Sequence, residues 1–243
     1  MGRLTLYQLL LPIKDKKYIL SLDVKSYFES ITQTLFEEIT HKEKIYFRDE
    51  IKVIYFRNGR LSRGLKASPI IAEFIGLKID AIVKELLYSQ NLTNTACYAR
   101  YYDDMIFSSD KKQDLENIKL LLENIISEKL KLEINQNKTK IKVTHGAKIL
   151  GLNFHNGQIT IPKKFKNRLR CMLYAYTRMP EYDCKDISDK KKVLGSTIGS
   201  LYYIINNTDN IQAGKYNSML DEQLKELERL NILFEKKKIE ENK

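Results

Sequence analysis

The sequence predicts an α+β fold in which an antiparallel, ferredoxin-like sheet is backed by helices and followed by a helical region. The first observation is residues 18–24, YILSLDV, where apolar and polar positions alternate up to Asp23 as in a half-buried strand. The second is an apolar stretch over residues 96–109 interrupted by two adjacent aspartates, which is typical of a β-hairpin. The third is a pair of long segments, 69–88 and 112–130, in which apolar residues recur at helical spacing.

Turn and capping residues define the elements between the first strand and the hairpin. Residues 31–41 are predicted to be helical, and Asn58-Gly59 forms a polar turn. Ser68 is a favourable N-cap and Pro69 suits the first helical position, so the long helix is expected to begin there.

Short strands are predicted at residues 140–143 and 149–154, which completes the order β, α, α, β-hairpin, α, β. The composition then changes, because the predicted helix over residues 161–178 contains basic residues and no acidic ones. These basic residues are Lys163, Lys164, Lys166, Arg168, Arg170 and Arg178. We therefore expect two domains, a sheet domain over 1–156 and a helical domain with a charged tail over 157–243.

The composition points to a polyanionic partner. The chain has 42 Lys and Arg against 31 Asp and Glu, a net charge of +11, which favours nucleic acid over an anionic membrane. A basic surface kept for solubility explains the charge alone equally well. The apolar runs are too short to span a membrane and no signal peptide is visible, so we expect a cytoplasmic protein without a membrane partner. Three Cys and three His without ligand spacing argue against a disulfide framework, a zinc site and triad hydrolysis.

Three aspartates are the candidate reaction centre. Asp23 ends the first strand and Asp103-Asp104 interrupt the hairpin, so strands about 5 Å apart would bring the three carboxylates to one sheet edge. A polar turn is the simpler interpretation of the adjacent pair. Clustered carboxylates raise one another's pKa unless a cation neutralises them, and Mg²⁺ is the hard cation that suits carboxylates and phosphates. Two such ions about 4 Å apart would support in-line phosphoryl transfer.

Several segments in this order resemble the motifs of reverse transcriptases, and the resemblance extends from about Tyr18 to Leu220. The palm motifs are LDVKSYFESI (22–31), RGLKASP (63–69), YARYYDDMIFS (98–108), NQNKTKI (135–141) and ILGLNF (149–154). IPKKFKNRLR and GSLYYIINN are similar to the thumb of bacterial retron-type enzymes. The resemblance implies a right-hand polymerase with a palm and a helical thumb, of the retron-like, defence-associated (abortive-infection) group.

The resemblance assigns metal binding to the three aspartates, with the backbone carbonyl of Val24 as a further ligand. It makes Lys138 a candidate acid for the pyrophosphate leaving group, with Lys140 as the rival and an ordinary solvated lysine as the alternative. Tyr27 matches the aromatic residue that excludes the ribose 2′-OH. Simple core packing is the alternative for Tyr27 and the favoured interpretation for Phe28.

The remaining implied contacts are with nucleotide and nucleic acid. Arg63, Gly64 and Ser68 of the second motif are expected near the incoming nucleotide, together with Tyr27 and Phe28. The residues expected to contact nucleic acid are Arg100, Tyr102, Lys163, Lys164, Lys166, Arg168 and Arg170. A structural salt bridge is the alternative for Arg100, and a solvated basic face is the alternative for the helix.

The sequence departs from the family pattern at two places. Arg63 stands where the family usually has Gln before its Gly, which puts the usual contact with the incoming sugar in doubt. Only 22 residues precede Asp23, where the family normally places its fingers. We therefore expect reduced fingers, which a partner chain, an oligomer or an RNA would complete.

On this resemblance we expect an RNA-directed DNA polymerase that adds dNTPs to a 3′-OH with two Mg²⁺ ions, or Mn²⁺ in their place. The implied partners are an RNA template, such as a dedicated non-coding RNA, and the DNA product, in an antiphage-defence ribonucleoprotein. Template-independent or protein-primed synthesis is the alternative among enzymes. A catalytically inactive subunit that binds RNA or a partner polymerase is the alternative from another class.

Overall fold

The computed structural model describes residues 4–241, which form two compact units. Residues 12–147 make one unit, here called the sheet unit, and residues 4–11 with 148–241 make the other, the helical unit. The division between Ala147 and Lys148 lies earlier than the boundary predicted at 156, and the N-terminal residues group with the C-terminal ones.

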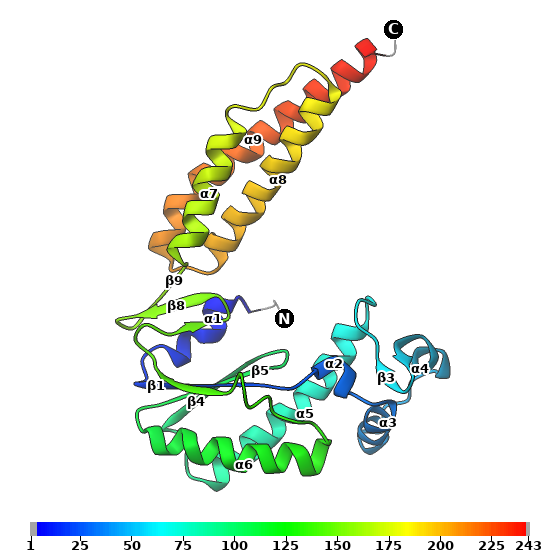
Figure 1. Ribbon diagram of the computed structural model, residues 1–243, viewed down its shortest axis with the longest axis vertical. Coiled ribbons are helices and arrows are strands. Elements are labelled where there is room, and N and C mark those ends of the chain that lie inside the picture. Colours follow the sequence, from blue (N-terminus) through cyan, green and yellow to red (C-terminus); the bar gives the residue numbers. More distant parts are fainter. Residues whose placement is uncertain (1–3, 242–243) are drawn as a thin grey trace. The chain divides into compact units, whose positions relative to one another are not determined.

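The sheet unit is built on four antiparallel strands in the spatial order β4-β5-β1-β6 (Figure 1). These strands are β1 (Tyr18–Asp23), β4 (Ala96–Tyr101), β5 (Asp104–Ser109) and β6 (Lys140–Val143). The other elements are a 3₁₀ turn (Leu11–Ile13), α2 (Tyr27–Ser30), α3 (Gln33–Lys42), α4 (Asp49–Tyr55), β2 (Phe56–Arg57), β3 (Arg60–Leu61), α5 (Ser68–Ser89) and α6 (Lys112–Leu130). The predicted antiparallel sheet backed by helices is confirmed.

Two long helices bury one face of this sheet. Figure 1 shows α5 and α6 lying together against the strands, and both contribute to the main hydrophobic core. Leu20 and Leu22 of β1 and Phe107 of β5 are completely buried in that core, as expected when alternate residues of a strand face the same side. The core therefore holds β1 and β5, whose ends carry the aspartates, in a fixed register.

The predicted elements and the observed ones differ at their ends. The helix over 112–130 has the predicted bounds, whereas Ala67 and not Ser68 is the N-cap of α5. The sequence analysis did not predict α4, and the turn at Asn58-Gly59 closes the short hairpin β2-β3. Both turn residues have positive φ, which is why Asn-Gly is favoured in a two-residue hairpin loop.

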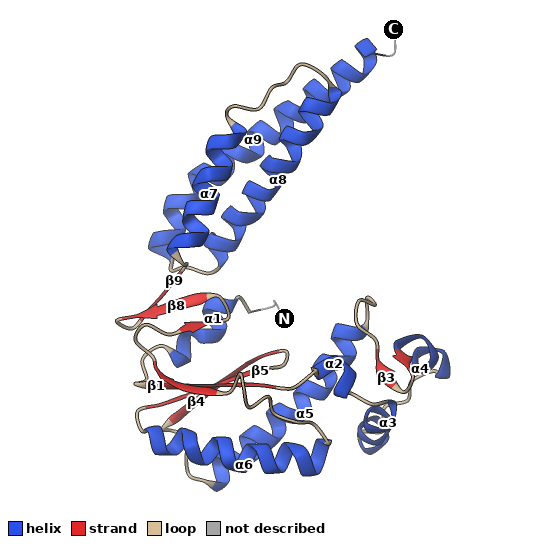
Figure 2. Ribbon diagram, in the orientation of Figure 1, coloured by secondary structure: helices blue, strands red, loops and turns tan. Residues whose placement is uncertain are grey.

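The helical unit combines a small antiparallel sheet with long helices (Figure 2). Its elements are α1 (Leu6–Leu10), β7 (Lys148–Ile149), β8 (Leu152–His155), β9 (Gln158–Thr160), α7 (Lys163–Tyr176), α8 (Cys184–Asn206) and α9 (Asn210–Glu241). Helices α8 and α9 pack along each other, and α7 packs on α8. The backbone N–H of Tyr7 donates to the side-chain oxygen of Asn207 at 3.2 Å, so α1 is attached to the end of α8.

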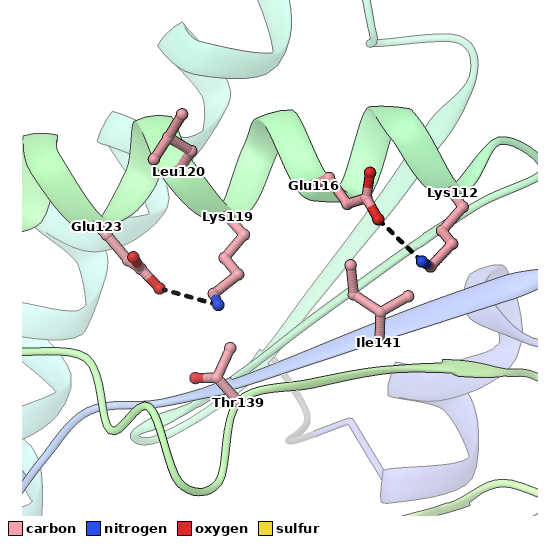
Figure 3. Close-up of a pocket in the computed structure, with 7 residues that line it drawn as sticks. All are labelled: Lys112, Glu116, Lys119, Leu120, Glu123, Thr139 and Ile141. Atoms are coloured by element: carbon pink, nitrogen blue, oxygen red, sulfur yellow. Dashed lines mark ion pairs between the residues drawn. The ribbon is translucent and has the colours of Figure 1, made fainter.

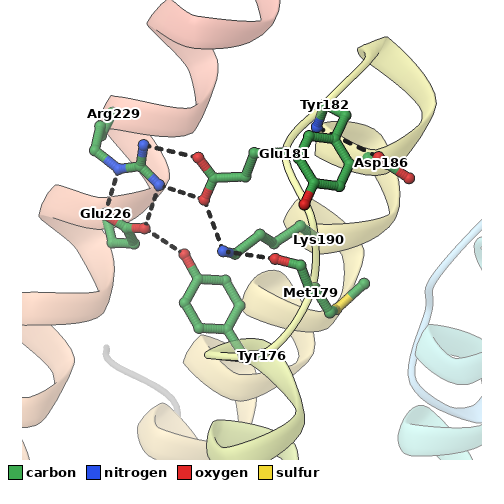
Figure 4. Close-up of polar contacts among 8 residues, drawn as sticks. All are labelled: Tyr176, Met179, Glu181, Tyr182, Asp186, Lys190, Glu226 and Arg229. Atoms are coloured by element: carbon green, nitrogen blue, oxygen red, sulfur yellow. Dashed lines mark hydrogen bonds and ion pairs between the residues drawn. The ribbon is translucent and has the colours of Figure 1, made fainter.

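An ion-pair cluster links the helices of this unit (Figure 4). The Arg229 guanidinium binds both Glu181 and Glu226, each through two of its nitrogens, at 2.6–3.0 Å. Lys190 donates to Glu181, and the Tyr176 hydroxyl donates to Glu226. Hydrogen bonds from Arg229 and Lys190 hold the pKa of Glu181 well below its usual range.

No helix between residues 4 and 241 combines the length and the apolar character that crossing a bilayer requires.

Candidate active site

Two of the three predicted aspartates face each other across neighbouring strands. Asp23 is the last residue of β1 and Asp104 the first of β5, and the two are directly paired in the antiparallel register. Buried neighbours on both strands, Leu22 and Met105, fix this register, because a slip by one residue would turn them out of the core. The predicted convergence of these two acids at one sheet edge is confirmed.

The third aspartate lies in the tight turn between β4 and β5. Tyr102 and Asp103 are the two turn residues, and Tyr102 has φ +54°, a left-handed conformation that costs a non-glycine residue about 1 kcal/mol. The Asp103 carbonyl accepts a hydrogen bond from the backbone N–H of Val24 at 3.3 Å. The turn is therefore attached to the residue that follows Asp23.

Asp23 already has partners in this structure. Its carboxylate accepts from Lys138 Nζ at 2.9 Å and from the side-chain amide of Asn135 at 3.2 Å. The backbone N–H of Asn135 also donates to the Asp23 carbonyl at 2.8 Å, which positions this loop beside the end of β1. Lys138, predicted as an acid for the leaving group, here acts as a counter-ion for a buried carboxylate.

The charges at this edge are not balanced. Burial raises the pKa of Asp104 to about 6, and the negative charges of Asp103 and Asp23 add to the shift while Lys138 opposes it. The hydrogen bond to Asp23 raises the pKa of Lys138, so this ammonium stays protonated at neutral pH. Three carboxylates thus share one nearby ammonium, and added positive charge would be stabilising here.

Tyr27 and Phe28 differ in burial in the opposite sense to the prediction. The Tyr27 ring is 1% exposed, and its hydroxyl donates to the carbonyl of Ala72 in α5 at 2.7 Å. Burial raises the pKa of the Tyr27 hydroxyl, consistent with a neutral core residue. Phe28 on the same short helix is only half-buried. The structure thus shows the core-packing alternative for Tyr27, and Phe28 has the more accessible ring.

Arg63 is bound to the helix that carries Phe28. Its Nε and Nη2 contact the two carboxylate oxygens of Glu29 at 2.6 and 2.7 Å, and its guanidinium lies 6.0 Å from the Phe28 ring centre. Arg60 donates to the Glu29 carbonyl at 2.8 Å. The guanidinium of Arg63 thus ties the 63–69 loop to α2, and its contact with the nucleotide stays a prediction.

The other two predicted residues of that loop differ in accessibility. Gly64 has φ +86° with open space around it, so its conformation and not crowding requires glycine. Ser68 is completely buried in the first turn of α5, and its hydroxyl has no hydrogen-bond partner among the described residues. A direct contact of Ser68 with a nucleotide would need this turn to open.

Arg100 is a structural residue and not an exposed nucleic-acid contact. Its side chain is 4% exposed and forms ion pairs with Glu73 and Asp80 of α5. Burial alone would lower the pKa of Arg100, but hydrogen bonds to the two carboxylates outweigh it and raise the pKa. The structure shows the salt-bridge alternative for Arg100 and leaves its guanidinium little exposed surface for a nucleic-acid contact.

A pocket of about 520 Å³ lies between α6 and the edge strand β6 (Figure 3). Its lining includes the ion pairs Lys112–Glu116 and Lys119–Glu123 together with Thr139 and Ile141. None of the predicted site residues lines it, so this pocket is separate from the aspartates.

Comparison with known proteins shows the family of this chain. Residues 5–154, more than half of the chain, match the family described as reverse transcriptase (RNA-dependent DNA polymerase). The chain belongs to the reverse transcriptase family. It is similar to the retron Ec73 reverse transcriptase of Escherichia coli, with 31% identity over 175 residues, 65% of this chain and 54% of that one. It is also 24% identical over 193 residues to the retron Mx65 reverse transcriptase of Myxococcus xanthus, covering 71% and 44% of the two chains.

This reverse transcriptase chain thus spans about half the length of the curated relatives it matches. Among solved structures, it is similar to a truncated apo telomerase of Candida tropicalis, with TM-score 0.46, 16% identity and coverage of 63% and 38%. It is also similar to Candida albicans telomerase in complex with a fragment of telomeric RNA, with TM-score 0.48, 14% identity and coverage of 91% and 47%.

Reverse transcriptases use divalent metal ions, so the aspartates can be tested against that requirement. Between residues 4 and 241, no three His, Cys, Asp or Glu side chains are arranged to hold a metal ion. The predicted ready-made cluster is therefore not found, and the Lys138 and Asn135 contacts with Asp23 give a physical reason. The donor set still fits, because three hard carboxylates with a raised pKa at Asp104 are what a divalent cation would neutralise.

The basic residues predicted to contact nucleic acid lie on α7 of the reverse transcriptase chain. Four of the five are exposed and Lys166 is half-buried. Within the described part of the chain none of the five forms an ion pair with an acid, and Arg170 donates only to the amide of Asn167. The exposed residues are Lys163, Lys164, Arg168 and Arg170. Tyr102, also predicted as a contact, is half-buried and packs edge-to-face on the exposed Tyr101.

The sequence analysis missed the residues that support the aspartates and Arg63. Asn135, which donates to Asp23, and Glu29, which pairs with Arg63, stand at no diagnostic spacing in the sequence. Glu73, Gly76 and Asp80 did leave a signal, because two acids flank a glycine on one face of a helix rich in apolar residues.

Proposed function

We propose that this chain is a reverse transcriptase polymerase unit that adds dNTPs to a 3′-OH on an RNA template by a two-metal-ion mechanism. The observation that carries the proposal is the pairing of Asp23 with Asp104, with Asp103 in the adjoining turn, in a member of this family. Asp23, Asp103 and Asp104 would hold two Mg²⁺ ions, which supply activation of the attacking oxygen and neutralisation of the phosphates. The backbone carbonyl of Val24 remains a candidate ligand.

The chain's own residues supply proton control and positioning. Lys138 keeps a proton at Nζ beside Asp23 and is the candidate donor to the leaving group once that carboxylate has another partner. Phe28 and Arg63, on adjoining surfaces, are the candidates for contact with the incoming nucleotide. The exposed cations of α7 would bind the phosphates of the template–primer duplex without reading its sequence.

Incorporation of labelled dNTP by the purified chain on a primed RNA template tests the proposal. We expect Mg²⁺-dependent, template-directed extension. Equal extension without template, or product covalently bound to the protein, would favour template-independent or protein-primed synthesis. If the chain binds RNA but incorporates no dNTP in Mg²⁺ or Mn²⁺, the result would contradict the proposed polymerase activity and favour a catalytically inactive subunit.

A role in an antiphage-defence ribonucleoprotein is proposed only from the resemblance of the sequence to defence-associated reverse transcriptases. Sequencing the nucleic acid that co-purifies with the chain would identify the template, and a dedicated non-coding RNA is expected. Comparing phage plating with the wild-type chain and Asp104→Asn tests the defence role, because protection should require the carboxylate.

Ribonucleotide discrimination should depend on Phe28 and not on Tyr27. Phe28→Val is expected to raise the ratio of rNTP to dNTP incorporation about 10–100-fold, because it replaces the accessible ring on α2 by a smaller side chain. Tyr27→Phe removes the hydrogen bond to Ala72 and should lower the free energy of unfolding by about 1 kcal/mol without changing the ratio. Single-nucleotide extension and thermal unfolding measure the two effects. The opposite pattern would show that Tyr27, and not Phe28, excludes the ribose 2′-OH.

A further inference from the structure

The buried guanidinium of Arg100 uses all five of its N–H donors. Nε and Nη2 bind the two oxygens of Asp80 at 2.8 and 2.9 Å. Nη1 and Nη2 bind the two oxygens of Glu73 at 3.0 and 2.9 Å. The remaining donor of Nη1 binds the backbone carbonyl of Tyr102 at 3.0 Å. The planar guanidinium suits this set, because lysine has three donors at one point and cannot span two carboxylates and a carbonyl.

Helix α5 leaves a space for this guanidinium. A Cβ on Gly76 would lie 2.3 Å from Nη1 and 2.5 Å from Cζ of Arg100. Glu73 and Asp80 stand on either side of Gly76 on the same face of the helix. Glycine in a helix interior costs about 1 kcal/mol relative to alanine. The guanidinium that lies against Gly76 explains why glycine stands here despite that cost.

The carbonyl that Arg100 binds belongs to the turn between β4 and β5. Tyr102 holds the left-handed conformation described above, and its carbonyl is fixed by Arg100 from the α5 side. The next carbonyl, that of Asp103, is fixed by the N–H of Val24 from the β1 side. Both peptide groups of the turn that presents Asp103 and Asp104 are therefore held by hydrogen bonds.

We infer that Arg100 is a positioning residue for the metal-binding turn, held by Glu73 and Asp80 in a space that Gly76 provides. It touches neither substrate nor metal and acts through the Tyr102 carbonyl. The inference rests on the proposed function, because it assumes that the turn presents carboxylates to a cation. It goes beyond that function because it assigns the positioning of the Asp103 and Asp104 carboxylates to Arg100, which holds the turn from the α5 side.

Arg100→Lys tests the inference, with Arg229→Lys as the matched control. Arg229 also binds two carboxylates through paired hydrogen bonds, but it lies in the helical unit and its hydrogen bonds go to Glu181 and Glu226. Both variants should lower Tm. Only Arg100→Lys should weaken Mn²⁺ binding, measured from the free-ion electron paramagnetic resonance signal, by about 10-fold. It should also raise the Mg²⁺ concentration for half-maximal incorporation and lower kcat more than it changes the KM for dNTP.

A second pair of variants tests the space beside Gly76. Gly76→Ala is expected to lower both Tm and Mn²⁺ affinity in the wild-type background, because the methyl group displaces the guanidinium. In an Arg100→Ala background the same substitution should raise Tm by about 2–4 °C, since alanine then only improves the helix. This reversal of sign does not depend on Arg100→Lys folding well.

The outcomes separate this inference from the proposed function. An active wild type whose Arg100→Lys variant binds Mn²⁺ and turns over normally would overturn the positioning role while leaving the function intact. A wild type that binds Mn²⁺ without incorporating dNTP would contradict the function, and the Arg100→Lys affinity would still decide the positioning role. A wild type that binds no Mn²⁺ would overturn both.

Discussion

Asp104→Asn is expected to reduce dNTP incorporation about 10³-fold while making the metal-free protein more stable at neutral pH. Activity falls because the proposed metal site loses a charged ligand. Stability rises because Asp104 is buried beside Asp103 and Asp23, which raises its pKa from 3.8 to about 6. Ionising it in the fold therefore costs up to about 3 kcal/mol, or about 1–2 after solvent screening, and Tm should rise about 3–6 °C.

The pH dependence has a definite sign. A carboxyl whose pKa is higher in the folded state favours folding below pH 3.8, and that contribution is lost as pH rises through about 6. In EDTA, the Tm of the wild type should thus lie closest to that of Asp104→Asn at pH 5 and furthest below it at pH 7.5. Added Mg²⁺ should raise Tm at pH 7.5 in the wild type alone.

The matched control is Asp110→Asn, one residue beyond the same strand. The hydrogen bond from Lys16 lowers the pKa of Asp110, so this substitution should slightly destabilise the protein and leave incorporation unchanged. If Asp110→Asn is stabilised as much as Asp104→Asn, the raised pKa of Asp104 does not explain the gain in stability. If Asp104→Asn retains activity, Asp104 is not a metal ligand.

Neutralising three cations of α7 should weaken nucleic-acid binding independently of sequence. The triple variant Lys163→Gln, Lys164→Gln, Arg168→Gln removes exposed charges that form no ion pair with an acid in the described chain. Each lost phosphate contact lowers the slope of log K against log salt by roughly 1, so the slope should fall by about 3. We expect an affinity loss of about 10–100-fold near physiological salt, measured by fluorescence anisotropy on two unrelated RNA–DNA duplexes.

A control triple on α9 makes the same change in net charge. Lys215, Lys225 and Lys236 are exposed, and their replacement by Gln should leave most of the affinity and slope in place. Equal losses from both triples would show that net charge, and not the α7 face, governs binding.

Local rules predicted the fold of the sheet unit well. Alternation gave β1, and helical periodicity gave α5 and α6, because these elements bury one continuous apolar face. The same local rules failed to predict α4, which has no buried residue and hence no strong apolar periodicity. The grouping of residues 4–11 with the helical unit was not predicted, because it depends on contacts such as that of Tyr7 with Asn207, which lie far apart in sequence.

The candidate site was predicted where backbone pairing determines it and not where side-chain direction does. The meeting of Asp23 with Asp104 follows from strand order alone. Which of Tyr27 and Phe28 is buried depends on the side of a four-residue helix that faces α5, and so short a helix carries too little periodicity to show this. The burial of Arg100 depends on two acids and a glycine in another element.

The attachment of α1 to the end of α8 has a consequence for the order of folding during synthesis. The sheet unit is one continuous stretch, whereas the helical unit is completed by residues from both sides of it. The sheet can therefore fold as soon as residue 147 has left the ribosome. The contact of Tyr7 with Asn207 can form only after Asn207, 200 residues later, has been synthesised. Closing so large a loop is slow compared with local helix formation, so docking of α1 should be a late event that reports completion of the helical unit.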